Sequence, residues 1–414
     1  MDESPASETN EEFGFRTPPP LVRRVSVSNY KSIGSCSVEL QPLTILVGRN
    51  GAGKSNFLDA LRFVHDSLKT SLDHALRDRG GLGAVRRIST GHPRNFAIEL
   101  ELSLPEEHVA TYGFEIASRR DGGYAVKRER LRIRDVRQAV RAHYSVTDAE
   151  VTAASAEHMM PASSDRLYLV NASGLPEFRP VYDVLLLMGF YSLNPEVIRD
   201  PQSPDAGDLL HRDGSNIASV VGRLAQDDPE AKDRIESYLA AIVPGILGVD
   251  RVPFAKRETL EFRRELHGAS HPRKSYAGSM SDGTLQVLGT LVAAFQPGLR
   301  NQHVRLVGIE EPETALHPHA AGALMNALTE ATENTQVVLT THSSDLIEGM
   351  PFDPTSLLVV DSRAGDTLIA PADRTSQQAI RDQLYTAGEL HRMNQLEPDE
   401  EALVRQLQRE LIAD

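Results

Sequence analysis

The chain has 414 residues, of which 40% are hydrophobic and 25% charged, and its formal net charge at pH 7 is −14. This composition is that of a water-soluble globular protein, and no apolar run is long enough to cross a bilayer, so we expect no membrane partner. The acidic balance argues against a dedicated nucleic-acid binder. The single cysteine, Cys36, excludes an internal disulfide framework and is typical of a cytoplasmic protein.

Residues 1–20 form an acidic, proline-rich stretch that predicts a disordered tail and lacks the segments of a secretory signal. Residues 21–28 and 35–40 read as short strands around a turn at residues 29–32. A third apolar strand at residues 43–47 runs into a glycine-rich loop. The helix that follows is predicted from apolar residues at helical spacing: Phe57, Leu61, Val64, Leu68 and Leu72.

The glycine-rich loop, residues 48–55, reads G-R-N-G-A-G-K-S and fits the phosphate-binding pattern G-x-x-x-x-G-K-[ST]. Its glycines let the backbone curl so that N–H groups face phosphate oxygens, and the next helix begins with partial positive charge. Lys54 would bring a full charge to the β- and γ-phosphates, and Ser55 a hydroxyl to Mg²⁺. The loop alone does not separate kinases, GTPases and ABC-type ATPases.

Residues 95–133 alternate like antiparallel strands. They run into a basic strip, residues 127–141 (from Lys127 to Arg141), in which Arg128, Arg130, Arg132 and Arg134 would share one face of a strand. One interpretation is a solvated sheet face, and the other is a strip that contacts the phosphates of DNA or RNA.

The last part of the chain alternates helices and apolar strands. Residues 208–243 have a helical pattern, strand-like pieces follow, and further helices are expected at residues 282–295 and 318–330. Apolar strands are expected between and after these helices, at residues 304–309, 336–341 and 356–360. Strands that alternate with crossover helices predict an α/β fold with a mostly parallel sheet.

Two of these strands end in polar residues whose side chains could take part in catalysis. Glu310 and Glu311 follow the strand at residues 304–309, where one carboxylate could serve the Mg²⁺ shell and the other could activate water. His342 follows the next strand, and a histidine in that position is more often structural. Because the carboxyl ends of parallel strands share one sheet edge, we expect these side chains near the phosphate loop.

A third segment, S-D-G-T at residues 281–284, precedes an apolar helix. Ser281 is a good N-cap, and Gly283 lets backbone approach a ligand closely. A simple helix cap is the plainer interpretation. His317 and His319 flank Pro318, which is expected to open a helix and splay the two rings, so we expect a loop there rather than a zinc site.

In this order, the motifs resemble those of ABC-type ATPases of the SMC/RecF/OLD class, and most of all stand-alone bacterial ATPases of the AAA-type core without a Toprim domain. The segments NYKSI, NPEVIRDP, HRDGSNIASVV and TAGELHRMNQLEP extend the resemblance over nearly the whole chain beyond the tail. Two departures stand out. The first acid, Glu310, is aspartate in many relatives, and no glutamine marks a Q-loop, for which residues 190–199 are the nearest candidate.

The resemblance implies a role for each motif. Lys54, Glu311 and His342 would be catalytic, with Glu311 as the base and His342 as the switch histidine, and Ser55 and Glu310 would hold Mg²⁺. The residues that would contact ATP are Asn50, Gly51, Gly53, Lys54, Ser55, Asn56, Ser281 and Gly283. Of these, Ser281 and Gly283 would reach the γ-phosphate of ATP bound to the opposite subunit.

The resemblance also implies a P-loop NTPase of the ABC-head type with an antiparallel β subdomain and a partly helical insertion. The expected parts are a tail (1–20), ATPase lobe I (21–144), the insertion (145–275), lobe II (276–370) and a C-terminal extension (371–414).

We expect a homodimer around two ATP molecules, with further assembly left open, that hydrolyses ATP and controls nucleic acid or a separately encoded effector in anti-phage defence or DNA maintenance. The alternatives are an ATP-gated, nearly non-hydrolysing scaffold and a small-molecule kinase.

Overall fold

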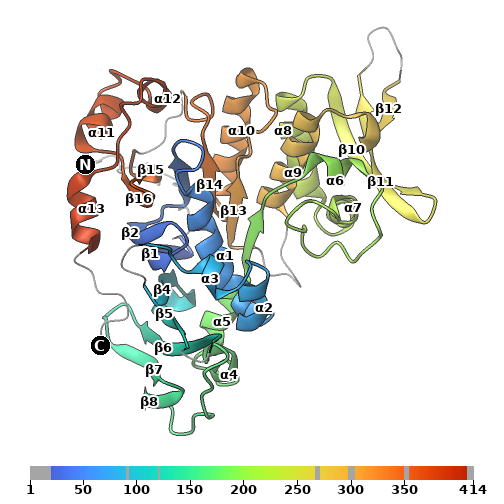
Figure 1. Cartoon of the computed structure of the whole chain (residues 1–414). Helices are drawn as coiled ribbons and strands as arrows, with labels where there is room; N and C mark the ends of the chain where they lie inside the picture. The colour runs from blue at the N-terminus through green and yellow to red at the C-terminus, as the bar shows by residue number, and fades with distance from the viewer. Residues whose placement is uncertain are drawn as a thin grey trace, which may run out of the picture.

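The computed structural model describes residues 20–89, 93–119, 122–265, 271–296, 304–348 and 354–407. Residues 1–19, and with them the predicted tail, lie outside this part. Among the described residues, thirteen strands form one mixed sheet in the order β8-β7-β6-β5-β4-β1-β2-β16-β15-β3-β14-β13-β9. In Figure 1, the antiparallel end of this sheet lies at the bottom, and a mostly helical region lies at the upper right.

The predicted apolar strands form one part of this sheet, together with one strand, β9, that was not predicted. Neighbouring strands pair in parallel from β15 to β9, and the strands are β15 (Leu357–Arg363), β3 (Leu43–Val47), β14 (Gln336–Thr341), β13 (Leu306–Glu310) and β9 (Met188–Tyr191). All residues of β3 and β14 are buried, as expected for strands covered on both faces.

Alternate residues of these strands face two different cores. Leu46 points to the core that contains α1 (Lys54–Lys69), whereas Ile45 and Val47 point to the core that contains α9 (Asp282–Phe295) and α10 (Pro318–Ala331). The sheet therefore has helices on both faces, and its fold class is the predicted α/β class.

The antiparallel strands continue the same sheet rather than forming a separate one. They are β16 (Asp366–Pro371), β2 (Ile33–Glu39), β1 (Val22–Tyr30), β4 (Asn95–Ser103), β5 (Val109–Ser118), β6 (Tyr124–Arg134), β7 (Val140–Thr147) and β8 (Glu150–Ala154). β16 joins them to the parallel part through antiparallel pairing with β15 and one parallel pair, Thr367 with Ile33. The alternation at residues 95–133 thus predicted β4, β5 and β6.

Short helices complete the core on the α1 side: α2 (Leu72–Arg77), α3 (Leu82–Val85), α4 (Leu169–Ala172) and α5 (Arg179–Leu186). The helix predicted through Leu72 was too long. α1 ends at Lys69, and Leu72 opens α2 because the Ser71 hydroxyl accepts a hydrogen bond from the backbone N–H of His74.

The helical end of the molecule contains α9 and α10 together with α6 (Pro195–Arg199), α7 (Ile217–Asp227), α8 (Pro229–Ile242) and a second sheet of β10 (Ile246–Phe254), β11 (Arg257–Arg264) and β12 (Arg273–Tyr276). The single helical stretch predicted at residues 208–243 was wrong in one respect. Asp228 caps α8 and Pro229 takes its first position, so the stretch divides into α7 and α8, and no helix forms at residues 208–216.

Beyond β16, the described residues up to 407 form three helices, α11 (Arg374–Arg381), α12 (Ala387–Arg392) and α13 (Glu400–Leu407). In Figure 1 they lie on the side of β15 and β16, with α12 at the top of the molecule. None of the helices in the described ranges combines the length and apolar character that a membrane crossing requires.

Candidate nucleotide site

Three predicted motifs meet at one edge of the parallel sheet. The register pairs Glu310 at the end of β13 with Thr340, and Thr341 at the end of β14 with Val47 at the end of β3. The phosphate loop leaves β3, the acidic pair leaves β13 and His342 leaves β14. The common strand direction therefore brings together side chains from positions about 300 residues apart.

The phosphate loop has the backbone that its glycines predict. Gly51 and Gly53 have φ angles of 79° and 106°, in the left-handed region that favours glycine. The loop opens α1, whose first residue is Lys54, and the Lys54 Nζ donates hydrogen bonds to the carbonyl oxygens of Gly48 and Arg49 at 2.8 and 3.0 Å. Ser55 and Asn50 are exposed on the loop. The Lys54 side chain thus lies along the phosphate loop. Its ammonium group is therefore close to the place where N–H groups of the loop would bind a phosphate.

Residues from two distant segments, β16 and the turn after β1, support this loop together with the neighbouring Asn56. The Thr367 hydroxyl of β16 donates to the carbonyl oxygen of Ala52 at 2.8 Å, and a Cβ at Gly53 would lie only 2.0 Å from that hydroxyl. Ser32 contacts Thr367 at 2.7 Å, and the Asn56 amide donates to the Ser32 hydroxyl at 2.6 Å. Asn56, predicted as an ATP contact, is therefore engaged in this support. No motif pointed to Thr367.

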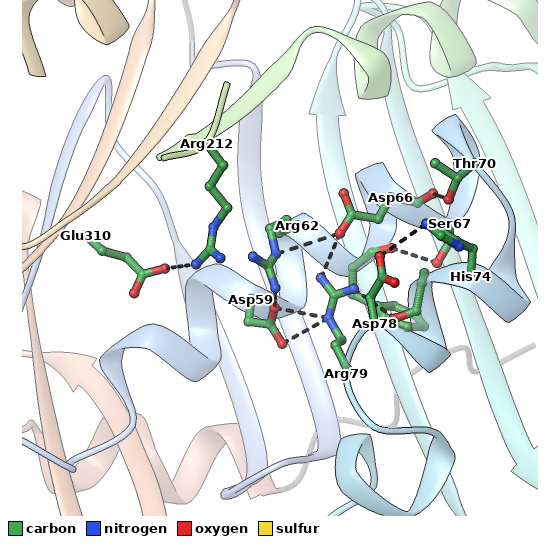
Figure 2. A network of polar contacts seen from close by, with 12 residues as sticks. Asp59, Arg62, Asp66, Ser67, Thr70, His74, Asp78, Arg79, Arg212 and Glu310 are labelled. Carbon is green, nitrogen blue, oxygen red and sulfur yellow. Dashed lines mark hydrogen bonds and ion pairs between the residues drawn. The ribbon is translucent and has the colours of Figure 1, made fainter. Parts of the chain in front are cut away.

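A buried ion network fixes α1 behind the loop, as Figure 2 shows. The Asp59 carboxylate forms ion pairs with Arg79 at 3.0 Å, with Arg62 at 2.6 Å and with Lys31 at 2.6 Å. Burial would raise the pKa of Asp59, but Arg79, Lys31 and Arg62 together hold it well below its usual range. The network joins α1 to the β1–β2 turn, whose Tyr30 hydroxyl also donates to Asp59 at 2.8 Å.

Glu310 ends β13 at the same edge and forms an ion pair with Arg212. The Arg212 Nη2 lies 2.9 Å from the Glu310 Oε1, a contact drawn in Figure 2. Arg212 belongs to the loop before α7, which is tied to the residues after β9 because Ser192 N–H donates to the Arg212 carbonyl at 2.9 Å. A hydroxyl from Ser55 and a carboxylate from Glu310 are the oxygen ligands that Mg²⁺ prefers, so these residues fit the ion.

Glu311 and His342 face each other across the strand ends. Glu311 has a φ of 44°, an uncommon value for a residue with a side chain, and its N–H donates to the Thr340 carbonyl at 3.0 Å. The His342 Nδ1 lies 3.5 Å from the Glu311 Oε1. Burial lowers the pKa of Lys54, and the carboxylates of Glu311 and Glu313 act in the opposite direction, so all three groups share one electrostatic site.

Glu313 is another residue of the site that sequence reasoning missed. It is the last acid of E-E-P-E and is buried, with an exposed fraction of 9%. Its Oε1 accepts hydrogen bonds from the Thr341 hydroxyl at 2.5 Å and the His342 N–H at 3.3 Å, whereas the buried Oε2 has no hydrogen-bond partner in the described structure. In the sequence, the only indication of a role for Glu313 was its position inside the E-E-P-E motif. The fold shows that its carboxylate binds the turn that carries His342.

The S-D-G-T segment caps α9 and packs against the loop that follows Glu313. The Ser281 hydroxyl accepts a hydrogen bond from Thr284 N–H at 3.3 Å, which is the predicted N-cap. A Cβ at Gly283 would lie 2.3 Å from the Ala315 carbonyl, so this glycine permits contact with the loop that follows Glu313. Arg199, at the end of α6, binds the Met280 carbonyl at 3.3 Å. It thereby links the predicted lobe junction to this turn.

Two smaller predictions have different outcomes. Arg128, Arg130, Arg132 and Arg134 of β6 share the outer face, because Glu129, Leu131 and Ile133 between them are buried. Arg128 also forms an ion pair with Glu115 of β5, 3.9 Å away, so the strip carries partly compensated charge. The expectation that Pro318 splays His317 and His319 was wrong, since their rings stack with centroids 5.2 Å apart.

Two protein families match consecutive parts of the chain. The family described as "AAA ATPase domain" matches residues 21–165, and the family described as "AAA domain, putative AbiEii toxin, Type IV TA system" matches residues 166–348. The two matches confirm the predicted resemblance to ABC-type ATPases of the SMC/RecF/OLD class. This class accounts for the order of phosphate loop, S-D-G-T turn, acidic pair and histidine along the chain.

Among curated proteins, the DNA replication and repair protein RecF of Clavibacter michiganensis subsp. michiganensis is 33% identical over 87 residues, which are 20% of this chain and 22% of RecF. The match thus spans about a fifth of that relative.

Two solved structures share the fold. One, an SmcHead bound to the C-winged helix domain of ScpA, has a TM-score of 0.50 and 12% identity over 85% of this chain and 98% of its own. The other is an Smc head with an extended coiled coil, bound to the C-terminal domain of ScpA derived from Pyrococcus furiosus. It has a TM-score of 0.50 and 10% identity over 88% of this chain and 99% of its own.

Proposed function

We propose that this protein is a Mg²⁺-dependent ATP hydrolase whose two copies close around two ATP molecules. The observation that carries the proposal is the convergence of Lys54, Glu310, Glu311 and His342 at the adjacent ends of β3, β13 and β14. In this arrangement Lys54 and the loop N–H groups bind the phosphates, while Ser55 and Glu310 hold Mg²⁺. Glu311 accepts a proton from the attacking water, and His342 contacts the γ-phosphate.

Closure by a second copy would complete each site. Ser281 is exposed at the start of α9, so a partner subunit can present it to the γ-phosphate. A phosphate bound by both subunits would hold the dimer closed, and hydrolysis would release it. Asn50 and Gly51, both exposed on the loop, would lie at this junction.

The output of closure would be control of a nucleic acid or of a separately encoded effector protein in the cytoplasm, in DNA maintenance or anti-phage defence. The RecF relative supports the first partner, because its name describes DNA replication and repair. The two ScpA-bound neighbours support a protein partner for this kind of head. The outer face of β6 is the surface we propose for DNA or RNA.

One observation favours an alternative, an ATP-gated scaffold with almost no turnover. Arg212 pairs with Glu310 and would compete with Mg²⁺ for that carboxylate. Phosphate release by the purified protein, compared with Glu311→Gln, separates the two functions. We expect the unmodified protein to release phosphate at least tenfold faster while both bind ATP, since loss of one catalytic group commonly costs that much or more. Equal, negligible release with retained ATP binding would support the scaffold.

A further inference from the structure

The C-terminal motif T-A-G-E-L-H-R-M-N-Q-L, residues 386–396, contacts the nucleotide site from outside the ATPase motifs. We call it the α12 segment. The His391 Nε2 lies 3.3 Å from the main-chain oxygen of His342, and the Asn394 Oδ1 accepts a hydrogen bond from Arg49 of the phosphate loop at 2.9 Å. The segment therefore touches two of the elements that surround the γ-phosphate position.

The segment is locally well defined. The Thr386 hydroxyl accepts from the Glu389 N–H at 3.0 Å, and the Glu389 carboxylate accepts from the Thr386 N–H at 2.9 Å, which together form a capping box at the start of α12. Such a reciprocal cap fixes the first turn of a short helix that could not be stable alone. His391 is thereby held at a defined position on α12.

The helix α12 packs against the turn directly after His342. The Thr386 hydroxyl donates to Glu348 at 2.8 Å, and Arg392 pairs with Asp345 at 3.3 Å and also with Glu348. The helix approaches closely, because a Cβ at Gly388 would lie 2.6 Å from the Ser344 carbonyl. Any shift of the turn that carries His342 must therefore be transmitted to α12.

The chemistry of His391 fits a neutral hydrogen-bond donor. A carbonyl oxygen can only accept, so the His391 Nε2 must carry the proton in this contact. Burial lowers the pKa of His391 and the hydrogen bond to the His342 main chain raises it, but the nearby charges of Lys54, His342 and Arg49 lower it further, so that the pKa lies below its usual value. A neutral imidazole adds no positive charge to the phosphate site, so its effect is on geometry.

We propose that the α12 segment is a positioning wall of the nucleotide site, in which His391 holds the main chain of His342 and Asn394 holds Arg49. This inference rests on the proposed ATP site and goes beyond it, because it gives the C-terminal motif a role. The segment would also couple occupancy of the γ-phosphate position to exposed side chains, Met393 within it and Leu384 and Tyr385 just before it.

Substitutions of His391 test the contact with a matched pair. Glutamine places its amide nitrogen close to the position of Nε2, whereas asparagine places it close to Nδ1, which does not contact His342. We expect kcat to fall about three- to tenfold in His391→Ala and His391→Asn, the cost of one hydrogen bond, and to recover in His391→Gln. ATP affinity should change less than twofold. Arg374→Ala, which breaks an exposed pair with Glu401 in the same extension, should change neither quantity.

A second measurement does not depend on turnover. Hydrogen exchange of residues 386–396 should slow on addition of ATP and Mg²⁺, together with residues 48–55, and the change at residues 386–396 should disappear in His391→Ala but persist in His391→Gln. Protection of the phosphate loop without any change in the α12 segment would overturn this inference and leave the ATP site intact. Absence of protection at both would overturn the ATP site as well. Equal behaviour of His391→Asn and His391→Gln would also contradict the inference.

Discussion

Glu313 illustrates how a single buried carboxylate can organise the site. One of its oxygens accepts from Thr341 and from the main chain of His342, and the other lies buried without a hydrogen-bond partner among the described residues. A buried charge is destabilising unless an opposite charge compensates it. Lys54 interacts electrostatically with this carboxylate, which raises the pKa of the lysine. Glu313 therefore offsets the charge of Lys54 while it holds the turn of His342.

This double role predicts an unusual kinetic effect for Glu313→Gln. Removal of a negative charge beside the phosphate position should tighten ATP binding several-fold, while the loosened His342 turn should lower kcat on the order of tenfold. Thr341→Val is the control, because it removes the hydroxyl donor and leaves the charge in place. It should lower kcat without tightening ATP binding. Binding assays with labelled ATP and phosphate release measure both effects, and weaker ATP binding by Glu313→Gln would contradict the account.

A second buried acid, Glu129 in β6, predicts a dependence of stability on pH. Its carboxylate accepts hydrogen bonds from Tyr144 at 2.8 Å and from the N–H of Leu169 at 2.8 Å, so it ties β6 to the start of α4. Burial raises its pKa from 4.5 to about 7, although these hydrogen bonds act in the opposite direction. The folded protein therefore holds this proton more tightly than the unfolded chain does.

For an acid whose pKa is raised by folding, the stabilising contribution is present below the unfolded value and is lost as pH rises through the folded value. We expect the free energy of unfolding to fall between pH 5 and pH 8 by up to about 3 kcal/mol relative to the Glu129→Gln variant. Urea denaturation at several pH values measures this difference. Parallel pH profiles of the two proteins would show that Glu129 does not titrate in this range.

The sequence was sufficient for the residues whose motifs lie at strand ends. Lys54, Glu310, Glu311 and His342 could be assigned to one site because each follows a buried apolar strand, and parallel strands share an edge. Thr367 and His391 could not be found in this way. Their partners lie 315 and 49 residues away, and contacts at such separations depend on how β16 and α12 pack.

At the scale of elements, the bounds of α9 and of two strands were predicted, whereas the helical stretch at residues 208–243 was not. The apolar runs at residues 43–47 and 336–341 became fully buried strands with those bounds. The helical pattern at residues 208–243 hid a break, because Asp228 and Pro229 can end one helix and begin another without interrupting the apolar periodicity. The continuity of the sheet could not be predicted from the sequence either, because its two parts are joined through β16.

The phosphate loop gives an element-scale prediction with an internal control. Gly51 and Gly53 both have positive φ, so alanine costs about 1–2 kcal/mol of backbone strain at either position. At Gly51 a new Cβ meets nothing within 4 Å, whereas at Gly53 it would overlap Thr367, which supports the loop. Gly53→Ala should therefore lose ATP binding far more than Gly51→Ala. Titration with labelled ATP measures both, and equal losses would show that Thr367 does not constrain the loop.

At the scale of the whole molecule, the antiparallel end exposes the arginine-bearing face of β6. Reversal of Arg130, Arg132 and Arg134 to glutamate should weaken binding to DNA or RNA and flatten its dependence on salt, because fewer phosphate contacts release fewer counterions. Affinity measurements between about 50 and 200 mM salt test this. If the unmodified protein binds neither nucleic acid at the low-salt end, the outer face of β6 is a solvated surface only.

Ser281 lies at the start of α9, and the phosphate loop lies at the start of α1. In the proposed dimer, each subunit would supply both halves of a phosphate clamp, one half to each of the two sites. This arrangement explains why the S-D-G-T turn packs against residue 315 of its own chain through Gly283 while the Ser281 side chain remains exposed. Completion of each proposed site therefore requires a second copy.

Molar mass by light scattering tests this dependence most directly, with Glu311→Gln used to prevent turnover. Upon addition of ATP and Mg²⁺, the Glu311→Gln protein should double its mass. The Glu311→Gln/Ser281→Arg protein should bind ATP and remain at the mass of a single chain, because the arginine obstructs the partner's phosphate. A dimer that forms equally well with Arg at position 281, or a Glu311→Gln protein that stays monomeric when saturated with ATP, would contradict the account.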